Sequence, residues 1–504
     1  MTRKDYWILF GLGLLVALVV ATLQHSPGYM DAEYYLLSGQ TLAAGAGLRE
    51  NILWNYLDVP AGLPHPAHSY WMPLPALLAA AGLRWLGGWW GARSVFLLAA
   101  ASLPPLSAYL SMLLTGRRGS ARVAGWLALL PGFYLPYIAT TDSFALAMLL
   151  GALFFVRLAG GLRTAWQAVA LGALAGGLHL ARAEGPLWLL LALWAAWRLA
   201  PRRGVWLSLA GYSAVMAPWW LRNLAAFGSP LAPGGSLGLW LTNYDELFSY
   251  PASQLTLQHW LASGWPAIVA ARASALGQNL ASTLVVSGLV ALAPLVVWGA
   301  WRLRRHAAVQ ASVLAWLALL LVFSVIFPFA GARGGFFHAA AALQPLVWAL
   351  AAAGLHAALE WGAARRGWEL TRAGHIFSLG VLGLALALSA YAVQVRVSHG
   401  AWDAGYRHYV EVAEQLDAWG IAPETRVLVN NPAGFSLASG RPAIVIPHGG
   451  PGPAGQAAQR YDARLLILEA NHQPSWDAIY SAGPLLSSLQ FLGEVGDTRI
   501  FRLP

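Results

Sequence analysis

The sequence has 504 residues, of which 58% are hydrophobic and only 10% are charged. Soluble proteins carry roughly a quarter charged residues, and a chain of this length could not bury so much apolar surface in a water-soluble core. The composition therefore excludes an ordinary soluble protein and predicts a polytopic integral membrane protein.

The net charge of +10 results from 31 basic and 21 acidic residues. In a soluble domain this excess would point to nucleic acid. Here the basic residues form short clusters between apolar runs, a pattern that sets the orientation of membrane proteins. We therefore expect no nucleic-acid partner. The absence of cysteine excludes disulfides, thiol chemistry and thiolate metal sites.

Apolar runs long enough to cross a bilayer as helices, ~17–25 residues, follow one another along most of the chain. The first, 6–23, follows Arg3 and Lys4 without a small-residue cleavage site after it, so we expect a retained span. Ten further spans are expected at 93–114, 123–140, 142–159, 165–182, 185–200, 205–221, 282–301, 307–329, 338–360 and 374–395.

Arginine clusters occupy alternate junctions between these runs. They are Arg117, Arg118 and Arg122; Arg157 and Arg163; Arg198, Arg202 and Arg203; Arg302, Arg304 and Arg305; and Arg365, Arg366 and Arg372. The positive-inside rule places all of them in the cytoplasm with the N-terminus. The sequence therefore predicts about eleven spans in the inner cell membrane, with the C-terminal part outside the cytoplasm.

Three regions are expected outside the membrane: a first loop at 24–92, a second loop at 222–281 and a tail at 396–504. Within the first loop, 71–87 is apolar but contains prolines, tryptophans and Arg84, which suits a helix lying in the interface. The tail has β-like runs at 426–430, 443–447, 465–469 and 499–503 after a helical stretch at 406–420.

These elements predict a mainly α fold. Residues 1–395 would form a transmembrane helical bundle with juxtamembrane helices, and 396–504 a small extracytoplasmic α/β domain. The segments Asn430–Pro432 and Pro447–Gly450 of this domain are typical of turns. Acceptor binding above the membrane is their alternative role.

Ionisable residues next to apolar segments are costly and need a reason. Asp31 and Glu33 precede an amphipathic helix expected at 36–48, where the helix dipole favours anions. Asp142 begins a span. Considered alone, Asp31 fits an N-cap as well as a site residue, and for Asp142 N-capping is the simpler interpretation. Arg182 and Glu184 share a junction short enough to hold an ion pair.

More polar residues fall on the same outer boundary. Arg222 and Asn223 end a span, Arg333 lies between glycines that allow close approach by a ligand, and His338 follows it. Carboxylates can act as general base or metal ligand, and guanidinium groups bind phosphate in a fork geometry. This combination suits a substrate with a phosphate head and a lipid tail.

Several short motifs occur in a characteristic order and topological placement. They are Asp31-Ala32-Glu33-Tyr34-Tyr35 with Gly39 and Leu42–Gly45, Pro73-Leu74-Pro75, Thr141-Asp142, Arg182-Ala183-Glu184-Gly185, Pro218–Asn223 and Phe227–Pro230. Together they resemble the GT-C superfamily of membrane glycosyltransferases, in particular the bacterial relatives of protein O-mannosyltransferases (glycosyltransferase family 39) and of the aminoarabinose transferase. The resemblance covers residues 1 to about 391.

The resemblance implies an inverting transfer of a sugar from a polyprenyl-phosphate donor to an extracytoplasmic protein, lipid or glycan. Asp31 matches the essential first-loop acid, which would deprotonate or orient the acceptor, and Asp142 matches a supporting acid. Arg222 and Arg333 would bind the donor phosphate. Further substrate contacts are expected from Glu33, Tyr34, Tyr35, His65, His68, Arg182, Glu184, Asn223 and His338.

The sequence departs from the family pattern at two places. Ala32 stands where many members have glutamate, with Glu33 one position later, and Leu74 interrupts a proline pair that follows His65 and His68. A divalent metal ion held by Asp31, Glu33 and His65 or His68 is an expectation from ligand type.

Two other classes of function fit parts of the sequence. A transporter or flippase of lipid-linked glycans would place ionisable residues and broken helices near the bilayer midplane, whereas here they gather at one boundary. A receptor or scaffold acting through 396–504 would leave the first-loop acids unexplained.

Overall fold

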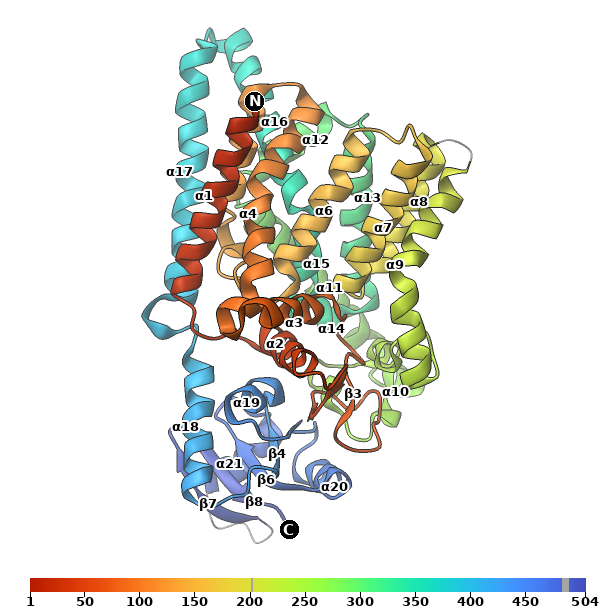
Figure 1. The fold of residues 1–504 in the computed structure, drawn as a ribbon, viewed down its shortest axis with the longest axis vertical. Helices are drawn as coiled ribbons and strands as arrows, with labels where there is room; N and C mark the ends of the chain where they lie inside the picture. The colour runs from red at the N-terminus through yellow and green to blue at the C-terminus, as the bar shows by residue number, and fades with distance from the viewer. Residues whose placement is uncertain (201–202, 483–488) are drawn as a thin grey trace.

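The computed structural model describes residues 1–200, 203–482 and 489–504. A bundle of helices occupies one end of the molecule, and the C-terminal α/β part lies at the other (Figure 1). The N-terminus lies at the end of the bundle far from the C-terminal part. Arg202, one member of the predicted arginine clusters, falls outside the described residues.

The bundle is built from helices that largely follow the predicted spans. They are α1 (Arg3–Thr22), α4 (Gly88–Thr115), α5 (Arg118–Leu129), α6 (Ser143–Ala159), α7 (Ala165–Ala181), α8 (Gly185–Leu199), α9 (Gly204–Phe227), α11 (Trp265–Ser282), α12 (Ala293–Arg302), α13 (Ala307–Leu321), α16 (Gln344–Arg366) and α17 (Leu370–Arg396). Short helical segments include η1 (Gly132–Tyr134), η6 (Thr283–Ser287), η7 (Val322–Ile326), α14 (Pro328–Ala330), η8 (Gly331–Gly335), α15 (Phe336–Ala340) and η9 (Ala341–Leu343).

Five helical stretches of the described chain are long and apolar enough to cross a membrane by length and composition. They are Arg3–Thr22, Gly88–Thr115, Ala307–Ile326, Pro328–Arg366 and Leu370–Ala418. Shorter apolar helices accompany them, among them α6, α7 and α8. The chain is thus a membrane protein with a mainly helical fold.

Two predicted spans are not continuous helices. The span expected at 123–140 ends as a helix at Leu129, because Pro131 disfavours helical backbone in the residue before it and Gly132 takes a φ of +63°. The span expected at 282–301 is interrupted at 288–292: α11 continues through the π-helical η6 to Ser287, and α12 begins only at Ala293. Both predictions of a continuous span were wrong because apolar composition does not encode these breaks.

Small residues let the helices of the bundle approach closely. A Cβ atom on Gly172 of α7 would overlap the backbone of Ser208 in α9, and one on Gly211 would overlap that of Val169. Gly151 of α6 packs in the same way on the backbone of Ala342. Such contacts are typical of helix packing in membranes, where lipid offers no hydrophobic drive between helices.

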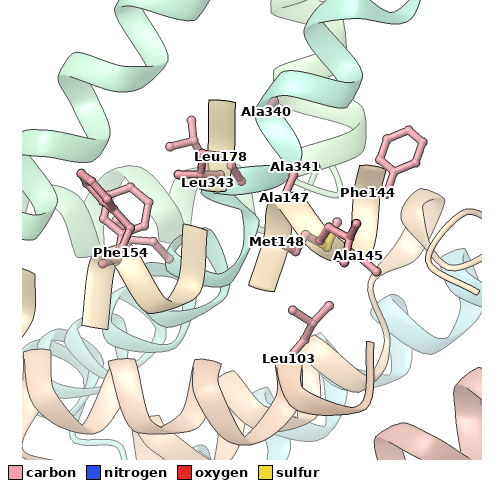
Figure 2. Packing of buried hydrophobic residues seen from close by; sticks show 14 of the residues in the cluster. Leu103, Phe144, Ala145, Ala147, Met148, Phe154, Leu178, Ala340, Ala341 and Leu343 are labelled. Carbon is pink, nitrogen blue, oxygen red and sulfur yellow. The ribbon is translucent and has the colours of Figure 1, made fainter. Parts of the chain in front are cut away.

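Large apolar side chains fill the spaces that remain between α6 and its neighbours. Phe144, Met148 and Phe154 of α6 pack near Leu178 of α7 and Leu343 of η9 (Figure 2). All five are almost fully buried. This core fixes the start of α6, which carries Asp142.

Two helices of the first loop lie across the end of the bundle, between it and the C-terminal part (Figure 1). α2 (Met30–Ala43) begins and ends earlier than the predicted helix at 36–48. α3 (Leu74–Leu86) corresponds to the segment expected to lie in the interface. The second loop, expected at 222–281, contains the short helix α10 (Leu257–Ala262) and most of α11, which the sequence did not predict.

The C-terminal part contains a six-stranded sheet of order β2-β5-β4-β6-β8-β7. The predicted β runs became β4 (Arg426–Val429), β5 (Ala443–Val445), β6 (Ala463–Leu468) and β8 (Thr498–Arg502), and β7 (Gln490–Val495) was missed. Strands β2, β5, β4 and β6 are parallel, whereas β8 and β7 are antiparallel. Helices α18 (Ala404–Ala418), α19 (Pro432–Ser439), α20 (Pro451–Tyr461) and α21 (Asp477–Ala482) accompany the sheet.

One strand of this sheet belongs to the first loop. β2 (Ile52–Leu53) pairs with Ala443 and Ile444 of β5, and both of its residues are nearly fully buried. A small antiparallel pair, β1 (Arg49–Glu50) and β3 (His65–Pro66), flanks it in sequence. The first loop is therefore held between the bundle and the C-terminal part.

Candidate active site

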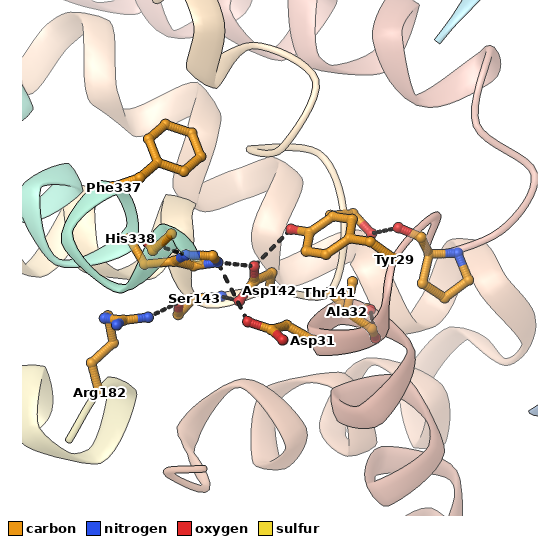
Figure 3. A network of polar contacts seen from close by, with 12 residues as sticks. Tyr29, Asp31, Ala32, Thr141, Asp142, Ser143, Arg182, Phe337 and His338 are labelled. Atoms are coloured by element: carbon orange, nitrogen blue, oxygen red, sulfur yellow. Dashed lines mark hydrogen bonds and ion pairs between the residues drawn. The ribbon is translucent and has the colours of Figure 1, made fainter. Parts of the chain in front are cut away.

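Asp31, Asp142 and His338 meet at the end of the bundle that faces the C-terminal part (Figure 3). Nε2 of His338 lies 3.0 Å from Oδ2 of Asp142 and 3.5 Å from Oδ2 of Asp31. Asp31 stands in the first turn of α2, Asp142 immediately precedes α6, and His338 lies in α15. Three segments far apart in the sequence thus converge on one polar group.

Hydrogen bonds from three hydroxyl groups fix the first loop against the start of α6. The Thr141 hydroxyl donates to the Ala32 carbonyl over 2.8 Å, and the Thr140 hydroxyl donates to the Pro27 carbonyl over 3.1 Å. The Tyr29 hydroxyl donates to Oδ2 of Asp142 over 2.6 Å. These bonds set the position of α2 and therefore of Asp31.

Asp142 has both of the roles considered for it, as a helix cap and as a site residue. It is the N-cap of α6, where its Oδ1 accepts from the Ser143 backbone N–H, and its Oδ2 binds Tyr29 and His338. Asp31 is not a cap, because the N-cap position of α2 is Tyr29. The capping interpretation is therefore wrong for Asp31, whose carboxylate is left for His338.

The orientation of His338 depends on a break in its chain segment. Gly334 has a φ of +112°, which only glycine adopts readily, and the helical run changes direction there. The Gly334 carbonyl lies 2.9 Å from Nδ1 of His338. Because Nδ1–H donates to this carbonyl, Nε2 can bond to a carboxylate only if a second proton lies between them. His338 and Asp142 therefore share a proton, and Asp31 lies beside this pair.

The two carboxyl groups differ in how far a substrate could reach them. The side chain of Asp142 is 1% exposed, whereas that of Asp31 is 31% exposed. Burial raises the pKa of Asp31 to about 6, with His338 and Arg182 opposing the rise and Asp142 adding to it. A carboxylate with a pKa near the working pH is suited to general-base chemistry.

Arg182 borders this group from the other side. Its Nε lies 2.5 Å from Oε1 of Glu184, so the ion pair considered for this short junction is present. One of its terminal nitrogens lies 3.4 Å from the hydroxyl of Ser143 (Figure 3). Arg182 and Glu184 therefore support the start of α6 next to Asp142.

The donor atoms of Asp31, Asp142 and His338 all lie within 4.8 Å of one another. Two carboxylates and an imidazole are acceptable ligands for a divalent ion, so these residues fit a metal. In the predicted ligand set of Asp31, Glu33 and His68, the two acids point to different faces of α2, because residues i and i+2 of a helix do not face each other. Glu33 and His68 do not belong to this group.

Glu33 faces the C-terminal part instead. Its Oε2 accepts from Nδ2 of Asn431 over 2.7 Å, and its side chain is nearly fully buried. Burial raises the pKa of Glu33 to about 7, opposed by the bond from Asn431 and assisted by the neighbouring Glu469. α2 thus presents Asp31 to the bundle and Glu33 to α19.

The predicted residues Tyr34, Tyr35, His65 and His68 are all buried in the first loop. The Tyr34 hydroxyl accepts from the His68 backbone N–H over 2.9 Å. Nε2 of His65 lies 3.2 Å from Oε1 of Glu50, and its Nδ1 lies 3.6 Å from Oδ2 of Asp58. Tyr34, His65 and His68 thus belong to an interior network of the first loop. Tyr35 lies close enough to Asp31, Asp142 and Arg182 to interact with their charges, so it borders the group around Asp31.

The two arginines expected at a donor phosphate have different surroundings. Arg222 donates to the backbone carbonyls of Leu48 and Ala67 over 3.1 and 2.6 Å and to Oδ1 of Asn223 over 3.1 Å, so it ties the first loop to α9. Arg333 is exposed, and its guanidinium carbon lies 4.6 Å from the centre of the Tyr244 ring. Arg333 is thus the more accessible of the two.

Sequence reasoning missed Tyr29 and Phe144 as members of the site. Tyr29 lies two positions before Asp31 and holds Asp142, and the Phe144 ring stacks on the His338 ring at 4.1 Å between centroids. An aromatic residue in an apolar segment carries no signal that distinguishes this role from core packing. The nearness of Tyr29 to Asp31 in sequence was the only available hint.

The fold is similar to that of solved membrane transferases. No family model and no curated protein sequence matches the chain. The apo oligosaccharyltransferase of Archaeoglobus fulgidus shares its fold with a TM-score of 0.58 and 11% identity, covering 93% of this chain and 70% of that one. The same enzyme in complex with Zn and sulfate gives a TM-score of 0.54 and 13% identity over 90% of this chain and 67% of that one.

A second transferase matches over almost its whole length. ArnT from Cupriavidus metallidurans bound to undecaprenyl phosphate gives a TM-score of 0.52 and 15% identity, covering 99% of this chain and 98% of that chain. Both of these proteins are GT-C superfamily glycosyltransferases. The chain therefore has the GT-C fold, as the sequence resemblance predicted.

Proposed function

We propose that the protein is a glycosyltransferase that moves a sugar from a polyprenyl-phosphate donor to an acceptor outside the cytoplasm. The observation that carries the proposal is the group of Asp31, Asp142 and His338 at one end of a GT-C fold, with Asp31 as its accessible carboxylate. ArnT, solved with undecaprenyl phosphate, supports the donor class.

In the proposed reaction Asp31 removes the proton from the acceptor nucleophile. The nucleophile attacks the anomeric carbon from the face opposite the phosphate, the bond from that carbon to the phosphate oxygen breaks, and its electrons leave with the polyprenyl phosphate. The result is inversion. Asp142 and His338 hold Asp31 in place and set its protonation, which makes them positioning residues.

Arg333 is proposed to receive the donor phosphate, because an exposed guanidinium offers several donors to phosphate oxygens, and Tyr244, on which it stacks, also interacts with Asp31. Arg222 is assigned the role of a first-loop anchor, since three of its hydrogen bonds already go to protein groups. A divalent ion bound by Asp31, Asp142 and His338 would add positive charge where the phosphate leaves.

The proposed orientation puts the N-terminus and the arginine clusters in the cytoplasm of an inner membrane, and the site, both long loops and residues 396–504 outside it. We propose 1–395 as the catalytic module and 396–504 as an α/β domain that covers it. A transporter of lipid-linked glycans is the weaker candidate, because transporter sites lie near the bilayer midplane whereas this group lies at one end of the bundle.

The donor class can be tested with purified protein in liposomes and an envelope extract as acceptor. We expect a radiolabelled sugar residue to be transferred to the extract from its polyprenyl-phosphate donor and not from the corresponding nucleotide sugar. Transfer from the nucleotide sugar alone would contradict the proposed donor. Movement of the intact lipid-linked sugar between leaflets without transfer would favour the transporter.

A further inference from the structure

A cavity of about 490 Å³ lies between α5, α16 and α17. These helices meet near the N-terminus of the chain, at the end of the bundle far from Asp31 (Figure 1). α17 is largely exposed along its length and leaves a gap against the other two helices. The cavity therefore lies apart from the candidate active site.

The lining of this cavity changes from polar to apolar along the helices. Near the helix ends it consists of Gly119, Ser120, Arg122, His356, Leu359, Leu370, Thr371, Gly374 and His375. Deeper in the bundle it consists of Val123, Trp126, Ala352, Leu355, Ser378, Leu379 and Leu382. From Thr371 to Leu382 the helix rises by ~16 Å at about 1.5 Å per residue. This gradient matches an amphiphile that enters with its tail inward.

The polar end of the cavity carries positive charge and unused hydrogen-bonding groups. Arg122 is exposed and has no salt bridge among the residues that the structure describes. The Ser120 hydroxyl is buried without a partner in the described structure. The nearest acid on α16, Glu360, is engaged by Arg117 at 2.8 Å, by His356 at 3.3 Å and by Arg302 at 3.4 Å. Asp5 of α1 is close enough to interact with Arg122, but in the part of the chain that the structure describes its carboxylate forms no ion pair with Arg122 and accepts from the Thr2 backbone N–H instead. An anionic headgroup would therefore meet Arg122 directly.

From this geometry we propose that the cavity binds one anionic membrane phospholipid. Its phosphate lies at Arg122, with the Ser120 and Thr371 hydroxyls beside it, and an acyl chain lies along Trp126, Leu379 and Leu382. Basic pockets between membrane helices are a known form of lipid headgroup site. The site is independent of the proposed transfer reaction, because its residues belong to the opposite end of the bundle.

Binding can be measured by native mass spectrometry of the full chain released from micelles that contain phosphatidylglycerol or phosphatidylcholine. We expect bound phosphatidylglycerol to exceed phosphatidylcholine. The variant Arg122→Gln should lose about fivefold in phosphatidylglycerol binding, the worth of one basic residue at an anionic surface. Arg118→Gln is the matched control, since Arg118 is exposed one turn before Arg122 on α5 but does not line the cavity.

A second pair of variants tests the apolar part without changing charge. A Cβ on Gly374 meets only Leu359 at 3.9 Å, so Gly374→Phe should fit and fill the cavity, and it should abolish the phosphatidylglycerol excess. Gly380→Phe, on the open side of α17, should leave the excess of bound phosphatidylglycerol unchanged. Equal binding of both lipids, equal losses in Arg118→Gln and Arg122→Gln, or undiminished binding in Gly374→Phe would overturn the proposal.

Discussion

Asp31 and Asp142 are two carboxyl groups at one site with different surroundings. Asp142 is enclosed and bonded by Tyr29, Ser143 and His338, whereas Asp31 is partly open and, among the residues that the structure describes, lies within ion-pair distance of His338 alone. Environments that separate two acids in this way commonly assign them different tasks. The structure supports Asp31 as the group that works on the substrate and Asp142 as the group that holds the site together.

The pKa of Asp31 gives a prediction for the pH dependence of transfer. The general base must be ionised, and burial raises its pKa to about 6. The value of kcat/KM should therefore be constant above about pH 7 and should fall as the pH is lowered through 6, because protonated Asp31 cannot accept a proton. A profile measured from pH 5 to 8 checks this. Activity that persists unchanged to pH 5 would exclude Asp31 as the base.

Tyr29 is predicted to be a positioning residue. In Tyr29→Phe the hydrogen bond to Asp142 is lost, and bonds to charged groups contribute about 1.5–3 kcal/mol. We expect kcat to fall by roughly tenfold or more with little change in KM, because this hydroxyl bonds to Asp142 and acts on the substrate only through it. Tyr137→Phe is a control, since Tyr137 packs on the Tyr29 ring without bonding to Asp142. A loss confined to KM would instead place Tyr29 in the substrate site.

At the scale of elements, the helices depend on close contacts that only small residues permit. α7 and α9 touch at Gly172 and Gly211, where an added Cβ has no space. Overpacking of this kind costs roughly 1–3 kcal/mol. Gly172→Ala should therefore lower the thermal unfolding temperature of the protein in detergent. Gly277→Ala, with nothing near its Cβ, should leave that temperature unchanged or raise it, and an equal loss in both variants would contradict the packing argument.

The sequence predicted most helices because a span must be apolar over a fixed length. It could not predict where apolar segments break. Two runs whose composition predicts a continuous helix are interrupted, one at Pro131 and Gly132 and the other at 288–292. Asp31, Asp142 and His338 were each recognisable as candidates. Their contact joins residues separated by 196 and 307 positions, and periodicity carries no information about such long-range pairing.

At the scale of the whole molecule, the first loop joins the two ends of the structure. β2 completes the C-terminal sheet, Glu33 bonds to Asn431, and Oδ1 of Asp403 accepts from the Ser26 hydroxyl over 2.7 Å. The tail composition predicted most of the strands in 396–504. It could not reveal that Ile52 and Leu53 supply one more, because a two-residue strand has no recognisable pattern.

This arrangement predicts that the C-terminal part stays bound after the chain is cut. A protease site inserted at the exposed His399 should give two fragments that copurify in mild detergent, because the β2–β5 pairing and the Glu33–Asn431 bond remain. Size-exclusion chromatography followed by gel analysis checks this. Ile52→Asp in the same cleavable chain should weaken the association, and separate elution of the fragments without that change would contradict the described interface.

The most direct test of the central claim compares sugar transfer by the wild-type protein and Asp31→Asn in liposomes, with radiolabelled polyprenyl-phosphate sugar and an acceptor extract. Asp245→Asn, an acid of the second loop, is the control. We predict that Asp31→Asn folds with the wild-type elution profile and loses at least about a hundredfold in rate, the lower range for general-base removal. Transfer by Asp31→Asn at the wild-type rate would contradict the assignment of Asp31 and the mechanism built on it.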